Sequence, residues 1–198
     1  MSIFAIIMFA VTAFFAYQIY RHVQTLEDLV KPMDAPIPPR PTSQTSLSTD
    51  ALIEEADEAY GEGELERARD KLRRANTLNA NNPEILNKLG FIEGKMGNIA
   101  EAITYYQHSL VIDPLDDLAH NALASLYKTN GDYAQAQEHY EKALNIDAEY
   151  PITYYNYGNL LSTMGETKRA SEMYERALIL DENFLEAKEA LEALKVNG

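Results

Sequence analysis

Residues 83–116 read PEILNKLGFIEGKMGNIAEAITYYQHSLVIDPLD, and this stretch decides the fold because its pattern returns every 34 residues. Three further blocks of the same length adjoin it without a gap, at 49–82, 117–150 and 151–184. Position eight of each block is Gly or Ala, position fifteen is always Gly, and position twenty is always Ala. Self-similarity at a fixed period of this size indicates a repeat architecture.

Each recurring residue type has a physical reason. The glycines at position fifteen are expected to end the first helix of each block, where a left-handed backbone is easiest for glycine. The small residues at positions eight and twenty are expected to face each other where two antiparallel helices cross. Position twenty-four, which is Leu72 in the first block and Tyr in the others, is expected to fill the gap to the next block. Each block therefore predicts one pair of helices.

The pattern resembles the tetratricopeptide repeat (TPR) family over about three quarters of the chain. Leu89-Gly90 and Tyr105-Tyr106 read like the family consensus. The first block departs from it at Glu55, where leucine is usual, as an end repeat often does.

The resemblance implies an all-α TPR solenoid, a right-handed superhelix of nine helices with a concave groove lined mainly by the first helix of each repeat. The four repeats at 49–184 supply eight of these helices. Residues 185–198, with apolar side chains at Leu185, Leu191 and Leu194, predict a capping helix and tail over the last apolar face.

The family places its groove residues at positions two, five, six, nine and twelve or thirteen of each repeat. The residues expected to bind a partner are Asn87, Phe91, Asn121, Ser125, Lys128, Tyr155, Asn156 and Asn159. An asparagine amide both donates and accepts hydrogen bonds, so a row of them suits an extended peptide backbone. Phe91 and Tyr155 would supply apolar anchors. In the alternative interpretation, these asparagines follow the family consensus and only aid helix solubility.

Chaperone-binding members clamp a C-terminal carboxylate with basic groove residues. The matching positions here hold Ile53, Asp57, Lys88, Leu118 and Ala122. Only Lys88 is basic, and it stands where the clamp wants an asparagine. This pattern disfavours binding of the C-terminal carboxylate of a chaperone.

Residues 1–31 predict a membrane anchor followed by a juxtamembrane helix. Ser2 to Tyr20 contains no charged side chain. As a helix this run spans about 28 Å, close to the roughly 30 Å of a bilayer core. A cleaved signal peptide fits less well, because no basic residue precedes the apolar run. A helix buried against the array is the weakest alternative, since the faces of the array are already used.

The flanking charges predict the orientation of this single-pass anchor. Arg21 and Lys31 both follow the apolar run, which favours a cytoplasmic TPR domain. Because Glu27 and Asp28 lie between these two basic residues, a TPR domain on the periplasmic side remains the alternative. The stripe formed by Ile19, Val23, Leu26 and Val30 would suit either a short homodimer seam or a helix lying on lipid.

Residues 32–48 predict an extended linker. Five prolines fall between Pro32 and Pro41, and a Ser/Thr-rich run follows. Such a sequence cannot form a core and acts as a spacer. A ligand for a proline-binding domain is the weaker alternative.

The composition disfavours several classes of function. The first 48 residues carry three bases and three acids, so the formal charge of −14 belongs to the rest of the chain. Such an acidic array would repel nucleic acid. No cysteine is present, which removes disulfides and thiolate metal sites. No catalytic, phosphate-binding or cofactor motif appears, and His120 is expected to pack rather than to bind metal.

The order of anchor, spacer and array predicts a membrane-anchored scaffold that recruits a peptide or protein partner. Assembly of a membrane or envelope complex is the leading role. The alternative is a receptor that captures unfolded or precursor polypeptides at the membrane. An enzyme is not expected.

Overall fold

The protein is described here from a computed structural model, which covers the backbone of residues 43–197 and the side chains of residues 49–195. Every regular element in that part of the chain is an α-helix. The nine helices are α2 (Ser43–Gly61), α3 (Leu65–Leu78), α4 (Pro83–Lys95), α5 (Ile99–Ile112), α6 (Asp117–Asn130), α7 (Tyr133–Ile146), α8 (Pro151–Thr163), α9 (Thr167–Leu180) and α10 (Leu185–Asn197). The prediction of an all-helical array with nine helices is confirmed.

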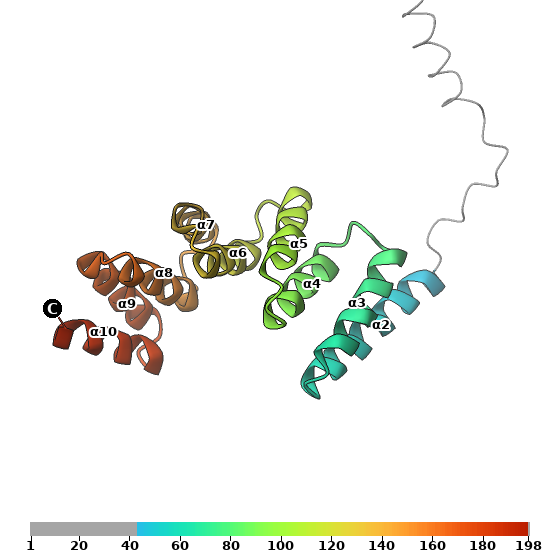
Figure 1. The fold of residues 1–198 in the computed structure, drawn as a ribbon, viewed down its shortest axis with the longest axis horizontal. Coiled ribbons are helices and arrows are strands. Elements are labelled where there is room, and N and C mark those ends of the chain that lie inside the picture. Colours follow the sequence, from blue (N-terminus) through green and yellow to red (C-terminus); the bar gives the residue numbers. More distant parts are fainter. Residues whose placement is uncertain (1–42, 198) are drawn as a thin grey trace, which may run out of the picture. The chain divides into compact units, whose positions relative to one another are not determined.

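The helices pack in pairs that follow the chain (Figure 1). The main contacts join α4 to α5, α6 to α7 and α8 to α9. Neighbouring pairs meet through α3 and α4, α5 and α6, and α7 and α8, while α10 packs on α9. The first helices of successive repeats also touch, because α4 contacts α6 and α6 contacts α8. These contacts place α4, α6 and α8 in one row.

The four glycines at position fifteen end the first helix of each pair, as predicted. Gly63, Gly97, Gly131 and Gly165 all have a positive φ, between 80° and 88°. The residue after each glycine donates its backbone N–H to the carbonyl five positions earlier, as in Asp132 to Tyr127 at 2.8 Å. This is the Schellman ending of a helix, which needs a left-handed residue at that point. The chain therefore turns at the same place in every repeat.

Small side chains fill the centre of each pair. The alanines at position twenty, Ala68, Ala102, Ala136 and Ala170, are fully buried. Position twenty-seven is buried as well, and its one polar member, Ser109, donates a hydrogen bond to the Pro83 carbonyl at 3.3 Å. Close helix approach at these points leaves no room for a larger side chain.

The nearest side chain to position eight in the second and fourth repeats is the aromatic ring at position twenty-four, and the expected contact with position twenty stays a prediction. A Cβ added to Gly90 would meet the ring of Tyr106 first, and one added to Gly158 would meet the ring of Tyr174. Both tyrosines occupy position twenty-four. The small residue at position eight therefore makes room for the aromatic ring of its own repeat. The tyrosine also reaches the next repeat, since Tyr140 stacks on Tyr157 with ring centroids 5.6 Å apart.

The first helix begins earlier than the repeat boundary predicts. α2 starts at Ser43, whereas the first repeat was expected from Thr49 and the linker to 48. No proline lies between Pro41 and the end of α2, so the helical backbone is not interrupted in this segment. The predicted anchor, most of the linker and the stripe of Ile19, Val23, Leu26 and Val30 lie outside the described residues. Among the helices that the structure describes, none combines the length and apolarity needed to cross a membrane.

Candidate functional site

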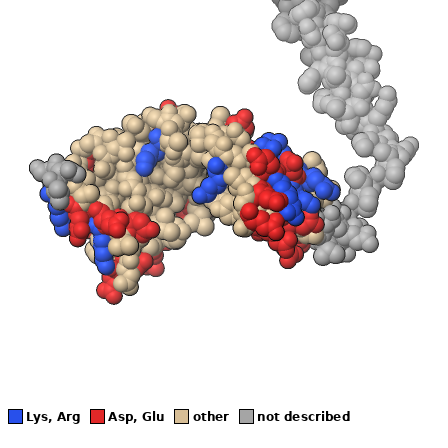
Figure 2. All heavy atoms as spheres, turned by 60° about the horizontal axis from the view of Figure 1, so that its bottom comes forward, with Lys and Arg blue, Asp and Glu red and all other residues tan. Residues whose placement is uncertain are grey.

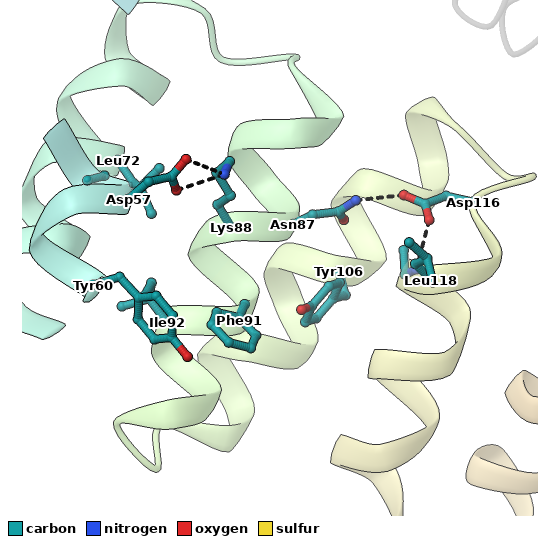
Figure 3. A pocket seen from close by; sticks show the side chains of 12 residues that line it. Asp57, Tyr60, Leu72, Asn87, Lys88, Phe91, Ile92, Tyr106, Asp116 and Leu118 are labelled. Atoms are coloured by element: carbon teal, nitrogen blue, oxygen red, sulfur yellow. Dashed lines mark hydrogen bonds and ion pairs between the residues drawn. The ribbon is translucent and has the colours of Figure 1, made fainter. Parts of the chain in front are cut away.

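A cavity of about 400 Å³ opens between the first helices of the first three repeats (Figure 3). α2, α4 and α6 form its walls, and side chains of α3 and α5 reach it from behind. The lining residues are Ala56, Asp57, Tyr60, Leu72, Asn87, Lys88, Phe91, Ile92, Tyr106, Asp116, Leu118 and Ala119. We call this the groove cavity. Its volume lies within the range of about 300–1,000 Å³ that is usual for ligand pockets.

The groove cavity presents large apolar side chains to solvent. Tyr60 and Phe91 are each 40% exposed, and their rings meet edge to face with centroids 5.2 Å apart. Leu118, from the start of α6, is more than half exposed. The Lys95 ammonium lies 5.3 Å from the centre of the Phe91 ring, within reach of a cation–π contact. Exposed apolar side chains gathered in a hollow are typical of an interaction site.

The polar wall of the groove cavity is already organised. Lys88 donates to both carboxylate oxygens of Asp57, at 2.8 and 2.9 Å. Asn87 donates through Nδ2 to Asp116 at 2.6 Å, and the other oxygen of Asp116 accepts from the Ala119 backbone N–H at 2.8 Å. Asp116 caps α6 and at the same time holds the Asn87 amide. The Asn87 Oδ1 atom is buried and accepts no hydrogen bond from the described residues.

Burial and the nearby Asp116 carboxylate raise the pKa of Tyr106 well above its usual range. The phenol behind the groove cavity therefore stays neutral at ordinary pH. The cavity thus combines a neutral aromatic interior with charged side chains at its rim, an arrangement suited to holding an apolar side chain of a ligand.

The predicted groove residues divide between two groups. Asn87 and Phe91 line the groove cavity. Phe91 and Ser125 line a second hollow of about 300 Å³ between α4 and α6. The structure therefore brings three of the eight predicted residues to the same stretch of the first-helix row.

The other five predicted residues, in α6 and α8, lie outside these two hollows. Asn156 donates to Asn121 at 3.3 Å, so these amides contact each other. The Asn159 amide oxygen accepts from the Tyr174 hydroxyl at 2.8 Å. The Tyr155 ring lies 5.1 Å from that of Phe184. Much of the predicted amide row therefore makes hydrogen bonds within the chain.

Lys128, the last predicted groove residue, is half-buried in α6. Burial lowers the pKa of its ammonium group. Its neighbour along the helix, Ser125, shares a hydrogen bond with the Tyr140 hydroxyl at 2.8 Å. This hydrogen bond joins α6 to α7 within the third repeat.

Sequence reasoning missed two groups at the groove. Tyr60 stands at position twelve of the first repeat, which is a groove position by the family pattern. No residue of this atypical repeat was among the predicted groove residues. The second group is a row of acids. A hollow of about 400 Å³ beside the groove cavity is lined by Asp50, Ile53, Glu54, Asp57, Glu58 and Glu84. We call this the acidic hollow, and it shares Asp57 with the groove cavity.

Comparison with known proteins shows which family has this fold. The tetratricopeptide repeat family model matches residues 81–149 and again residues 115–183. Comparison with the curated proteins finds no match. Among solved structures, MamA is 23% identical, with 72% of this chain and 83% of that chain covered and a TM-score of 0.65. YrrB, a TPR protein with an unusual peptide-binding site, is 18% identical, with coverage of 74% and 76% and a TM-score of 0.65.

A third structure holds a ligand. The first TPR of Spaghetti (RPAP3), bound to the HSP90 peptide SRMEEVD, is 25% identical, with 58% of this chain and 91% of that chain covered and a TM-score of 0.56. TPR proteins are typically scaffolds without enzymatic activity, and their fold suggests interaction with a protein or peptide. The two offset matches cover just over half of the sequence, and the chain belongs to the tetratricopeptide repeat family.

Proposed function

We propose that this protein is a membrane-tethered scaffold that recruits one protein or peptide segment through the groove cavity, in the assembly of a membrane or envelope complex. The observation that carries the recruiting role is the cluster of exposed apolar side chains in a hollow on the first-helix row. Tyr60, Phe91 and Leu118 come from three successive repeats and border the same 400 Å³ of space. A side chain from a partner that entered there would contact all three repeats at once.

The tether rests on the sequence alone. The uncharged run from Ser2 to Tyr20 and the basic residue that follows it favour a single-pass anchor with the TPR domain on the cytoplasmic side. Extraction of membranes at alkaline pH tests this part, with the full chain and a variant lacking residues 2–20. The full chain should stay with the lipid and the shortened chain should be released. Release of the full chain would remove the tether from the proposal.

Crosslinking tests the recruiting role. A photoreactive amino acid at Phe91 should capture one dominant partner in cells. The same amino acid at Lys168, an exposed residue of α9, serves as the matched control. Many partners at Phe91 would favour capture of unfolded or precursor chains instead. A pattern at Phe91 no different from that at Lys168 would reject the groove cavity as the recruiting site.

A further inference from the structure

The chemistry beside the groove cavity narrows the kind of segment that fits it. The described residues of α2 carry five acidic side chains and no basic one. They are Asp50, Glu54, Glu55, Asp57 and Glu58. All but Glu55 line the acidic hollow, where Glu84 of α4 joins them. The acidic hollow adjoins the groove cavity, because Asp57 lines both.

Most basic residues nearby pair with carboxylates, but Arg74 of α3 has no ion pair among the described residues. In α3, Lys71 pairs with Glu55, Arg67 pairs with Glu62 and Glu64, and Arg73 pairs with Glu93. Lys88 forms an ion pair with Asp57. In the part of the chain that the structure describes, four carboxylates of the acidic hollow have no ion pair. They are Asp50, Glu54, Glu58 and Glu84.

On the face drawn in Figure 2, acidic and basic side chains lie together over the α2 and α3 end, charged side chains also gather at the α9 and α10 end, and the middle of the face is largely uncharged. The groove cavity therefore adjoins the charged α2 and α3 end through Asp57, which also lines the acidic hollow. Uncompensated carboxylates next to an apolar hollow attract positive charge and raise its local concentration.

We propose that the recruited segment is basic and apolar, which rests on the proposed recruiting role of the groove cavity. Two or more Lys or Arg side chains lie over the acidic hollow, and one large apolar side chain of the same segment enters between Tyr60, Phe91 and Leu118. The apolar contact supplies the anchor and the charges supply selectivity. An acidic peptide such as SRMEEVD, which the RPAP3 domain binds, is repelled here.

A peptide library tests the proposal on the full chain in mild detergent. The probes are random ten-residue peptides, sequenced after capture by the immobilised protein. Captured peptides should be enriched in Lys or Arg at two or more positions and in Leu, Phe or Met at another. Enrichment of acidic peptides, or of apolar peptides without basic residues, would overturn the proposal.

Two matched triple variants test the basic part of the segment. Glu54→Gln, Glu58→Gln and Glu84→Gln together remove three charges without a change of shape, and should weaken binding of a captured basic peptide about tenfold. Glu182→Gln, Glu186→Gln and Glu189→Gln make the same charge change at the other end of the array and should leave binding unchanged. Equal loss in both triple variants would show a general effect of net charge and overturn the proposed contact.

Phe91→Ala separates this inference from the proposed function. If captured peptides depend on Phe91 but show no basic preference, the recruiting role stands and the basic segment is wrong. If no peptide depends on Phe91, the groove cavity is not the recruiting site and both fail. Binding of the basic peptides should also weaken as NaCl rises from 50 to 500 mM, because salt screens exposed charges.

Discussion

Gly90 lies against the ring of Tyr106 so closely that a Cβ at the glycine would sit 2.7 Å from both Cδ2 and Cε2 of the tyrosine. The same contact recurs in the fourth repeat between Gly158 and Tyr174, at 2.5 Å. The glycine of one helix and the tyrosine of the next thus form one packing unit. Tyr106 is buried and lines both the groove cavity and the second hollow, so an added Cβ would have to push its ring out of its packed position toward one of them.

Gly90→Ala should therefore destabilise the fold despite the better helix propensity of alanine. Overpacking costs about 1–3 kcal/mol, and the gain in propensity offsets up to about 1 kcal/mol. We expect a net loss of about 1–2 kcal/mol in the free energy of unfolding, measured by urea denaturation. Gly61→Ala is the control, because nothing lies within 4 Å of an added Cβ there.

A second substitution should restore the packing. The first repeat pairs Ala56 with Leu72 at the same two positions, and both are buried. Gly90→Ala combined with Tyr106→Leu copies this pair and should recover most of the lost stability. The third repeat holds Ala124 beside Tyr140, whose hydroxyl is bonded to Ser125. If Gly90→Ala alone leaves the stability unchanged, the Tyr106 ring must move to a position like that of Tyr140 in the third repeat.

The period of 34 residues was enough to predict the helix pairs, because each glycine of position fifteen has one physical role. Only a left-handed residue closes the Schellman ending, so the four glycines mark four helix ends. The close contact of position eight with the tyrosine ring at position twenty-four was not predicted. Periodicity says which residues are small, but the direction of the tyrosine side chain depends on its rotamer, which spacing does not fix.

The candidate site was predicted only in part. Phe91 follows from the family pattern and lines the groove cavity, whereas Asn121 and Asn156 contact each other. The groove positions were assigned one repeat at a time, so contacts between side chains of neighbouring repeats stayed hidden. The acidic hollow was missed because Glu84 comes from a different repeat than Asp50 and Glu54.

The buried Glu93 side chain ties the first repeat to the second. It is 1% exposed and accepts from Arg73 at 2.8 Å and from Asn98 at 2.7 Å. Arg73→Met should cost about 2–4 kcal/mol, because it leaves a buried carboxylate with one partner fewer. Urea denaturation measures the loss, and Arg74→Met, at an exposed residue of the same helix, should change little. Equal effects of the two variants would mean that the Arg73 contact adds nothing specific.

Lys88 limits the negative charge of the groove cavity through its pair with Asp57. Lys88→Met frees the Asp57 carboxylate and should strengthen binding of a captured basic peptide several-fold. Stability should change by less than about 1 kcal/mol, since the pair is partly exposed. Fluorescence anisotropy with the labelled peptide measures the affinity. Weaker binding in Lys88→Met would mean that the ammonium group itself contacts the ligand.

Two histidines meet on the side of the array formed by the second helices. The Nδ1 atoms of His120 and His139 lie 2.8 Å apart, so one ring must accept and cannot carry a proton there. Lys142 and Glu138 of α7 face the pair, and His120 also contacts the Pro114 carbonyl at 3.3 Å. Burial, and then the charges of His120 and Lys142, lower the pKa of His139 to about 4.

This pair should make stability depend on pH in a defined window. The unfolded chain takes up a proton at His139 near pH 6.5, but the folded chain does so only near 4. Between these values the unfolded state binds more protons, so the free energy of unfolding falls as the pH falls. We expect a loss of about 1–2 kcal/mol from pH 7.5 to 4.5, since solvent screens a half-buried group. Urea denaturation at both pH values should show a smaller loss in His139→Phe, while His108→Phe, at an exposed residue, keeps the full loss. All three proteins carry the same set of carboxylates, so equal losses would show that the histidine pair does not cause the pH dependence.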